Sequence, residues 1–242
     1  MGDWILTPSQ YAVLWTGLQV TIQLLVLAFL LGVGLSLVVG VGRLSQRRWI
    51  RGAALAYVEF ARGISSIILL FIMVFAIPIL LDFDAFGRFG FAVIALGINM
   101  GGYGAEIVRG SINAIPKGQT EATIALNLSP TQRLRYIVLP QAMRIILPPM
   151  GNLTIEILKG TALVALVAIS DLMQATRNLI QQQLAEGVAG VTILFINVLV
   201  IYFIVAQVIN GLFRFGEHLI ERRYRPRTGR RAVTVPAPEV RA

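Results

Sequence analysis

The sequence predicts an all-α, polytopic membrane protein with about five transmembrane helices and one long cytoplasmic loop. Three observations lead to this prediction. Of the 242 residues, 56% are hydrophobic and only 14% are charged, whereas soluble domains carry roughly 25% charged residues. Several stretches long enough to cross a bilayer contain no charge at all. The basic residues are concentrated in the segments on one side of these stretches.

The first uncharged stretch, residues 4–42, is 39 residues long, and one bilayer-spanning helix needs only roughly 20. We therefore expect an interfacial start, in which Trp4, Tyr11 and Trp15 lie at the membrane surface, followed by a helix over 17–41. A secretory signal peptide fits poorly, because a basic start is missing and the apolar stretch is too long.

Four later stretches predict the other spans. The 19 uncharged residues between Arg62 and Asp82 predict a helix over 63–81. The remaining spans are expected over 89–110, 145–170 and 188–213.

Residues 1–221 are expected to form one transmembrane domain, with a coupling loop over about 111–143. Residues 222–242 contain seven arginines, three prolines and one acid. This composition is typical of a basic, disordered tail, and it lacks the interleaved aromatic residues of a nucleic-acid site. We therefore expect no nucleic-acid partner.

The distribution of positive charge predicts the orientation. With Arg62 and Lys159 set aside because they fall within or at the rim of spans, 17 of the 21 lysines and arginines lie on the side of the long loop and the tail. Only Arg88 and Arg177 lie on the opposite side. The positive-inside rule then places the N-terminus outside and the C-terminus in the cytoplasm. Anionic membrane lipids are expected partners of these basic segments.

The loop over 111–143 has the signals of two short helices. Pro116 precedes the first, and Ser129 followed by Pro130 fits an N-cap with proline at the first helical position of the second. Pro140 is expected to break or bend the chain. Because the loop also carries apolar residues, it is expected to present a surface for a partner protein.

This loop resembles the EAA loop of ABC importer permeases. That motif reads Glu-Ala-Ala, three residues, Gly, nine residues, then Ile-x-Leu-Pro, and residues 121–127 and 137–140 match its spacing. Further stretches narrow the resemblance to the polar amino acid uptake family, of the histidine, glutamine and arginine type; they are 105–110, 115–119, 139–142, 147–152 and 158–161.

Three positions depart from the family pattern. Thr123 replaces the second alanine, and Asn127 replaces the glycine at the turn. Asparagine tolerates a positive φ, so we expect the turn to survive. After Gly63 the usual Thr-Pro is missing, which leaves room for an unusual solute such as ectoine.

The resemblance implies that the loop docks on a separate ATP-hydrolysing subunit. The sequence itself contains no G-x-x-x-x-G-K-[ST] motif and so offers no phosphate-binding loop of its own. It further implies a bacterial inner (plasma) membrane, a second permease chain, identical or homologous, and an extracytoplasmic solute-binding protein. No cofactor or metal is expected. The residues expected to couple to the ATPase are Glu121, Ala122, Ala125, Asn127, Leu128 and Pro140.

Three spans carry an acid followed three residues later by a base: Glu59–Arg62, Glu106–Arg109 and Glu156–Lys159. Because residues three apart share a helix face, each pair could neutralise itself. Charges at membrane depth can equally line a solute path. Polar side chains within spans can line that path or join helices. The candidate path residues are Glu156, Lys159, Thr161, Asn99 and Tyr103.

The sequence therefore predicts the permease subunit of an ATP-driven importer for a polar amino acid or a related zwitterionic solute. An ion-gradient-driven transporter is the main alternative, although we find no internal repeat. A membrane-embedded enzyme is disfavoured, because His218 is the one histidine and the chain has no cysteine. A structural assembly subunit would show no uptake at all.

Overall fold

The computed structural model describes residues 6–185 and 191–224, and within these ranges the chain forms helices and turns without a strand. The helices are α1 (Pro8–Gly42), α2 (Arg48–Gly63), α3 (Ser66–Phe71), η1 (Ile72–Ala76), α4 (Ile77–Leu81), α5 (Gly87–Asn113), α6 (Lys117–Ala125), α7 (Pro130–Arg133), η2 (Leu134–Val138), α8 (Leu139–Thr161), η3 (Ala162–Val167), α9 (Leu172–Ala185) and α10 (Val191–Tyr224).

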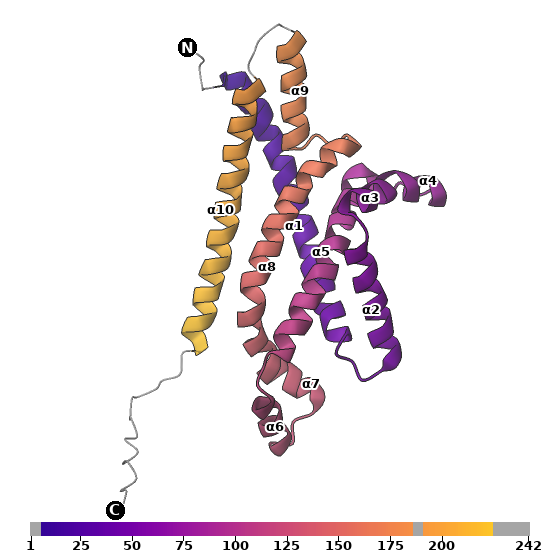
Figure 1. The fold of residues 1–242 in the computed structure, drawn as a ribbon, viewed down its shortest axis with the longest axis vertical. Helices are drawn as coiled ribbons and strands as arrows, with labels where there is room; N and C mark the ends of the chain where they lie inside the picture. Colours follow the sequence, from indigo (N-terminus) through magenta and orange to yellow (C-terminus); the bar gives the residue numbers. More distant parts are fainter. Residues whose placement is uncertain (1–5, 186–190, 225–242) are drawn as a thin grey trace, which may run out of the picture.

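The long helices form a bundle (Figure 1). In the described ranges, four segments are long and apolar enough to cross a membrane: α1, α5, the continuous stretch from α7 to η3, and α10. A bent pair, α2 with α3–α4, makes a fifth crossing if it counts as one span. The start of α1 and the end of α10 lie at opposite ends of the bundle, and α6 and α7 lie at the end where α5 finishes and α8 begins (Figure 1).

Helix α1 begins earlier than predicted. Thr7 and Gln10 form a reciprocal capping box, and Pro8 occupies the first turn. The chain is therefore helical from Pro8 onward, and Tyr11 and Trp15 belong to α1 rather than to a separate interfacial segment. Trp4 lies outside the described residues.

The second crossing differs most from the prediction. Instead of one helix over 63–81, the chain rises through α2 and then turns by 103° into α3, η1 and α4. Residues Gly63–Ser65 make the turn, and Ile64 is extended. Counting uncharged residues missed α2 because it carries Arg48, Arg51, Glu59 and Arg62 around a narrow apolar face. That buried face consists of Ala54, Val58 and Ala61.

Two π-helical segments each precede a proline. η1 ends two residues before Pro78, and η2 ends two residues before Pro140. A proline cannot donate a hydrogen bond to the carbonyl four residues earlier, and its ring crowds that group. The wider π turn accommodates this defect. Pro140 therefore does not break the chain as expected, and the helix continues from α7 through η2 into α8.

The bundle packs most tightly where α5 crosses its neighbours. A Cβ atom on Gly102 would lie 2.5 Å from Cβ of Ala61 in α2, and one on Gly97 would lie 2.6 Å from Leu31 in α1. Larger side chains at these positions would push the helices apart. The glycines of α5 therefore allow α1 and α2 to approach its backbone closely.

Helix α9 was not predicted. It follows the turn after η3, where Ala168 adopts a positive φ of 57°. Its N-terminus is capped by Asp171, whose Oδ1 accepts a hydrogen bond from the amide of Gln174. The buried face of α9, which includes Leu172 and Leu179, packs in a cluster with Leu14 of α1 and Leu194 of α10. The helix is short and polar on its outer face, so span counting treats it as a loop.

At the other end of the chain, α10 runs to Tyr224, so the first three residues of the expected tail are helical. The rest of that tail, 225–242, and the expected start of the last span at 188–190 lie outside the described residues.

Candidate functional site

A polar cavity lies between α2, α5 and α8. It has a volume of about 470 Å³, and its polar lining consists of Arg62, Tyr103, Glu106, Asn152 and Glu156. A smaller cavity of about 170 Å³ shares Tyr103, Leu153 and Glu156 with it. This second cavity adds the side chains of Ser66 and Asn99. Together they form a polar lining inside an apolar bundle, which we call the polar cavity.

Helix contacts hold the polar cavity in place. Asn99 is buried, and its Nδ2 donates a hydrogen bond of 3.2 Å to the carbonyl of Ala61. Tyr57 donates a hydrogen bond of 2.9 Å to the carbonyl of Ile98, which adds a second link between α2 and α5. The guanidinium of Arg62 lies 5.4 Å from the ring centre of Tyr103, a cation–π contact. Arg62 therefore faces the cavity.

Three of the five predicted path residues line the polar cavity: Asn99, Tyr103 and Glu156. Lys159 and Thr161 lie outside its lining. Thr161 is fully buried, and its hydroxyl donates a hydrogen bond of 2.6 Å to the carbonyl of Leu158. Arg62 and Asn152 line the cavity without having been predicted as path residues. Their only sequence signals were a charge at the rim of a span and an asparagine within the motif stretch 147–152.

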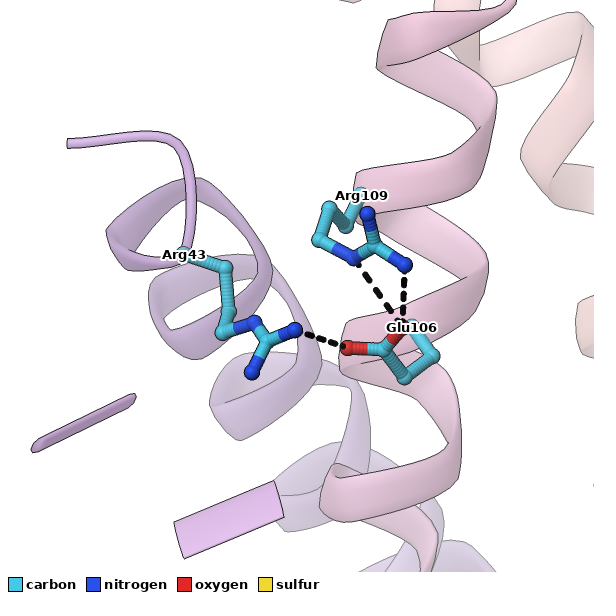
Figure 2. A network of polar contacts seen from close by, with 3 residues as sticks. All are labelled: Arg43, Glu106 and Arg109. Carbon is cyan, nitrogen blue, oxygen red and sulfur yellow. Dashed lines mark hydrogen bonds and ion pairs between the residues drawn. The ribbon is translucent and has the colours of Figure 1, made fainter. Parts of the chain in front are cut away.

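Of the three acid–base pairs, Glu106–Arg109 closes on itself. Arg109 donates two hydrogen bonds, of 3.0 and 2.7 Å, to Oε2 of Glu106 (Figure 2). Arg43, at the C-terminal end of α1, adds an ion pair of 3.4 Å to Oε1 (Figure 2). Among the described residues, neither Glu59 with Arg62 nor Glu156 with Lys159 forms an ion pair. The self-pairing interpretation therefore holds for Glu106–Arg109 and fails for the other two.

The sequence predicted two short helices in the long loop; α6 is the first, whereas the second, α7, is the start of the continuous stretch that runs to η3. Ser129 and Gln132 form a capping box at the start of α7, with Pro130 at its first position. Asn127 adopts a positive φ of 58° after α6, so the predicted turn is confirmed. The amide of Leu128 donates to the carbonyl of Thr123, which closes the end of α6 in a Schellman-type bond.

The outer surface of α6 is apolar and open. Ile124 is 56% exposed and Leu126 is 72% exposed, whereas Thr123 is buried beneath them. A hydrogen bond of 3.2 Å from Gln141 Nε2 to Gln119 Oε1 ties α6 to the start of α8. Helix α8 also lines the polar cavity. We define the coupling surface as Glu121, Ala122, Ile124, Ala125 and Leu126, all exposed.

Of the other residues predicted for coupling, Asn127 is exposed in the turn, and Leu128 and Pro140 are half-buried. Leu134 packs against the main apolar core. These placements leave α6 as the most accessible part of the loop.

A multi-span helical bundle with an open polar cavity between α2, α5 and α8 fits a membrane transport subunit. The chain belongs to the family of binding-protein-dependent transport system inner membrane components, whose family model matches residues 32–215. It is accordingly a multi-pass inner-membrane permease subunit of an ABC transporter, not an enzyme, and it works with an ATPase component.

Several curated relatives match most of this chain at similar sequence identities. The chain is 37% identical over 210 residues to the probable amino-acid ABC transporter permease protein y4tF of Sinorhizobium fredii, a match that covers 85% of this chain and 86% of the relative. It is 31% identical to the L-cystine transport system permease protein TcyB of Bacillus subtilis, covering 89% and 88%. It is 32% identical to the glutamine transport system permease protein GlnP of Escherichia coli, covering 88% and 94%.

Two solved structures have a similar fold. The crystal structure of an amino acid ABC transporter with histidines is matched with a TM-score of 0.78 at 27% identity, over 90% of this chain and 99% of that one. An inward-facing MetNI methionine ABC transporter is matched with a TM-score of 0.72 at 21% identity, over 89% and 99%. The second likeness concerns the fold alone.

Proposed function

We propose that this chain forms the transmembrane path of an ATP-driven importer for a polar amino acid or a related zwitterionic solute. The observation that carries the proposal is the pairing of opposite charges in the polar cavity: Arg62 on α2 and Glu156 on α8 line the same space. Charged groups at membrane depth are costly, so their presence around a cavity favours a role in solute passage. The amino-acid names of the relatives y4tF, TcyB and GlnP agree with it.

The chemistry of the cavity suits a zwitterion. A guanidinium binds a carboxylate through two parallel hydrogen bonds, which makes Arg62 the candidate partner of the solute carboxylate. The carboxylate of Glu156 would accept hydrogen bonds from the solute ammonium. Tyr103 and Asn152 supply further polar groups along the same lining. A ring zwitterion such as ectoine offers both charges as well, so the proposed class includes it.

The cavity is open in the single chain, which supports a second permease as partner. Arg62, Asn152 and Glu156 are exposed, and three uncovered polar residues would meet lipid unless another surface closed over them. A second permease chain, identical or homologous, would complete the path, and an extracytoplasmic binding protein would deliver the solute.

We further propose that the ATPase docks on the coupling surface. Exposed apolar residues on a short helix outside the spans have no packing role within this chain. The Gln119–Gln141 hydrogen bond and the continuous helix from α7 to η3 would carry the movement to the cavity.

The proposed orientation has the α6 end of the bundle in the cytoplasm, in agreement with the positive charge at that end. The chain has no cysteine, so single cysteines can report the topology. Cysteines at Asp84 and Gln181 should react with an impermeant thiol reagent from outside. Cysteines at Gln46 and Gln132 should react only after the membrane is opened, and the reverse pattern would refute the orientation.

Uptake of labelled solutes by the assembled transporter tests the function. We would compare glutamine, cystine, arginine, histidine and ectoine with the wild type, Glu156→Gln and Arg62→Gln. Lys159→Gln is the matched control, because Lys159 is exposed but does not line the cavity. Loss of uptake in the two cavity variants at normal abundance, with the control unaffected, supports the proposal. Normal uptake in all three would refute the path.

The energy source is tested in the same assay. Depletion of ATP should stop uptake while an intact ion gradient remains. If collapse of the gradient stops uptake and loss of ATP does not, the chain serves a gradient-driven transporter instead.

A further inference from the structure

A third cavity lies at the α6 and α7 end of the bundle, and it shares no lining residue with the polar cavity. It is a groove of about 600 Å³ between the end of α1, the start of α2, the end of α5 and the α7–η2 segment. This volume falls within the range of roughly 300–1,000 Å³ typical of small-molecule sites. None of the residues of the coupling surface lines it. We call it the arginine groove, after the one charged residue in its lining, Arg133.

The walls of the arginine groove are mostly apolar. Val38 and Val41 come from α1, Ile50 from α2, and Leu134 and Val138 from η2. Val38 is 74% exposed, and it continues an exposed stripe on α1 that includes Leu27 and Leu31. These residues are spaced three to four apart or in multiples of that spacing, so they share one helix face. The apolar wall of the groove is therefore continuous with an exposed apolar stripe of α1.

One end of the groove is cationic. The Nε atom of Arg133 is buried and has no hydrogen-bond partner. This atom is closed to the groove, but the Arg133 side chain is part of the lining and brings a positive charge to it. Among the described residues, no acidic side chain lines this space.

The rim of the groove has the character of a membrane surface. Trp49 is 91% exposed at the start of α2, and tryptophan is enriched at the level of lipid headgroups. Arg47, Arg48 and Arg51 surround it and are exposed. The turn between α1 and α2 is held in place by Ser45, whose hydroxyl accepts a hydrogen bond of 3.2 Å from the amide of Arg47. The groove therefore opens where apolar side chains give way to basic ones.

We propose that the arginine groove binds an anionic phospholipid of the cytoplasmic leaflet. The headgroup phosphate accepts a charge-assisted hydrogen bond from Arg133 and lies near the basic rim. One acyl chain lies along Val38 and Val41 and follows the exposed stripe of α1. This occupant places an anionic group beside the Arg133 charge and covers the apolar wall at the same time. Neither a free phosphate nor an apolar chain alone does both.

The lipid would hold four elements together. The groove is formed by α1, α2, the end of α5 and the α7–η2 segment, and η2 leads directly into α8. A bound lipid therefore sits beside the helix that connects the coupling surface to the polar cavity. This site is independent of the proposed transport function, since neither its walls nor its charge belong to the solute path.

The test uses the full-length permease purified with its ATPase subunit from nanodiscs of equal phosphatidylglycerol and phosphatidylcholine. Lipids retained after transfer to detergent are counted by native mass spectrometry. The wild type should retain phosphatidylglycerol preferentially, and Arg133→Gln should lower that retention about tenfold, as expected for the loss of one charge-assisted bond. Phosphatidylcholine retention should not change.

Arg135→Gln is the matched control. Arg135 is a nearby exposed arginine outside the groove, and its guanidinium lies 5.9 Å from the ring centre of Tyr136. This variant should retain phosphatidylglycerol like the wild type. Val41→Trp fills the groove and should lower the retention of both lipids. This variant tests lipid binding in the groove even if Arg133→Gln fails to fold.

Three results would overturn the proposal. The first is wild-type retention in Arg133→Gln or in Val41→Trp. The second is displacement of the lipid by millimolar inorganic phosphate, which would identify a phosphate site. The third is loss of the ATPase subunit from Arg133→Gln with lipid retention unchanged, which would identify a protein contact. Transport activity enters none of these readouts, so failure of the transport proposal leaves the lipid test intact.

Discussion

The backbone amide of Leu172 donates a hydrogen bond of 3.1 Å to the hydroxyl of Thr21, across 151 positions of the sequence. Thr21 lies in α1 and Leu172 begins α9, and both are fully buried. Next to this bond, a Cβ atom on Gly17 would lie 2.9 Å from the carbonyl oxygen of Asp171. The bond therefore fixes α9 against α1 at a point where the two backbones nearly touch.

Thr21→Val should destabilise the protein through this contact. Valine keeps the shape of threonine but removes the acceptor, and a buried amide left without a partner costs about 1–3 kcal/mol. We would measure the free energy of unfolding of the purified permease in mixed micelles. Thr16→Val is the control, because the Thr16 hydroxyl is exposed and bonds only within α1, to the carbonyl of Val13. Equal stability of the two variants would contradict this role for Thr21.

The stability of this region should depend on pH through Asp171. Burial raises the pKa of the Asp171 carboxyl from 3.8 to about 6, although hydrogen bonds from the amides of Gln174 and Met173 oppose the shift. A carboxyl whose pKa is raised on folding stabilises the fold most below its unfolded pKa and loses that contribution as pH rises through its folded pKa. The loss is expected between about pH 4 and pH 6.

Asp171→Asn should remove this dependence, since asparagine caps a helix about as well as aspartate. When the pH is raised from 5 to 7.5, the free energy of unfolding of the variant should rise by about 1 kcal/mol relative to that of the wild type. Unfolding measured at both pH values gives the difference directly. Asp84→Asn, at an exposed site between α4 and α5, should follow the wild type. If the free energies of unfolding of Asp171→Asn and the wild type differ by the same amount at both pH values, the prediction is wrong.

Glu106→Gln should weaken the joint between α1 and α5. The side chains of Arg43 and Glu106 are only 16% and 20% exposed, so neutralising the acid leaves a largely buried guanidinium without its ion pair. We expect a loss of about 2 kcal/mol in unfolding free energy, less than for a fully buried pair. Glu59→Gln is the control, because Glu59 is exposed and forms no ion pair among the described residues. It should change stability by less than about 0.5 kcal/mol.

Ala122→Arg should uncouple the permease from its ATPase. Ala122 is exposed on the coupling surface, so arginine there adds bulk and charge at the proposed contact without disturbing the spans. The variant should insert and fold normally but fail to co-purify with the ATPase, and ATP-driven uptake should be lost.

The matched control is Ala185→Arg, an exposed alanine at the end of α9. It should keep both ATPase association and uptake. If Ala122→Arg lowers the abundance of the permease and Ala185→Arg does not, Ala122 packs the loop instead. If Ala122→Arg keeps both ATPase association and uptake, the ATPase does not dock on the coupling surface.

The sequence by itself determined the features that depend on neighbouring residues. The absence of charge over long stretches predicted a helical membrane protein, because backbone groups in a bilayer must be satisfied within a helix. The ends of α6 and α7 were predicted from Asn127, Ser129 and Pro130 for the same local reason. A cap or a turn is completed by groups a few residues away, and both predicted features are present.

Only the tertiary structure decided the features that depend on packing between distant segments. Helix α2 carries too many charges to be recognised as part of a crossing, and its narrow face becomes apolar surface only against α5. The polar cavity unites Arg62 with Glu156 and leaves Lys159 outside because helix rotation selects which side chains share a space. Spacing along one helix allowed three ion pairs, and among the described residues one of the three formed. Of the other charges, Arg62 contacts Tyr103 of α5 and Glu156 lines the polar cavity, and no local pattern specifies these neighbours.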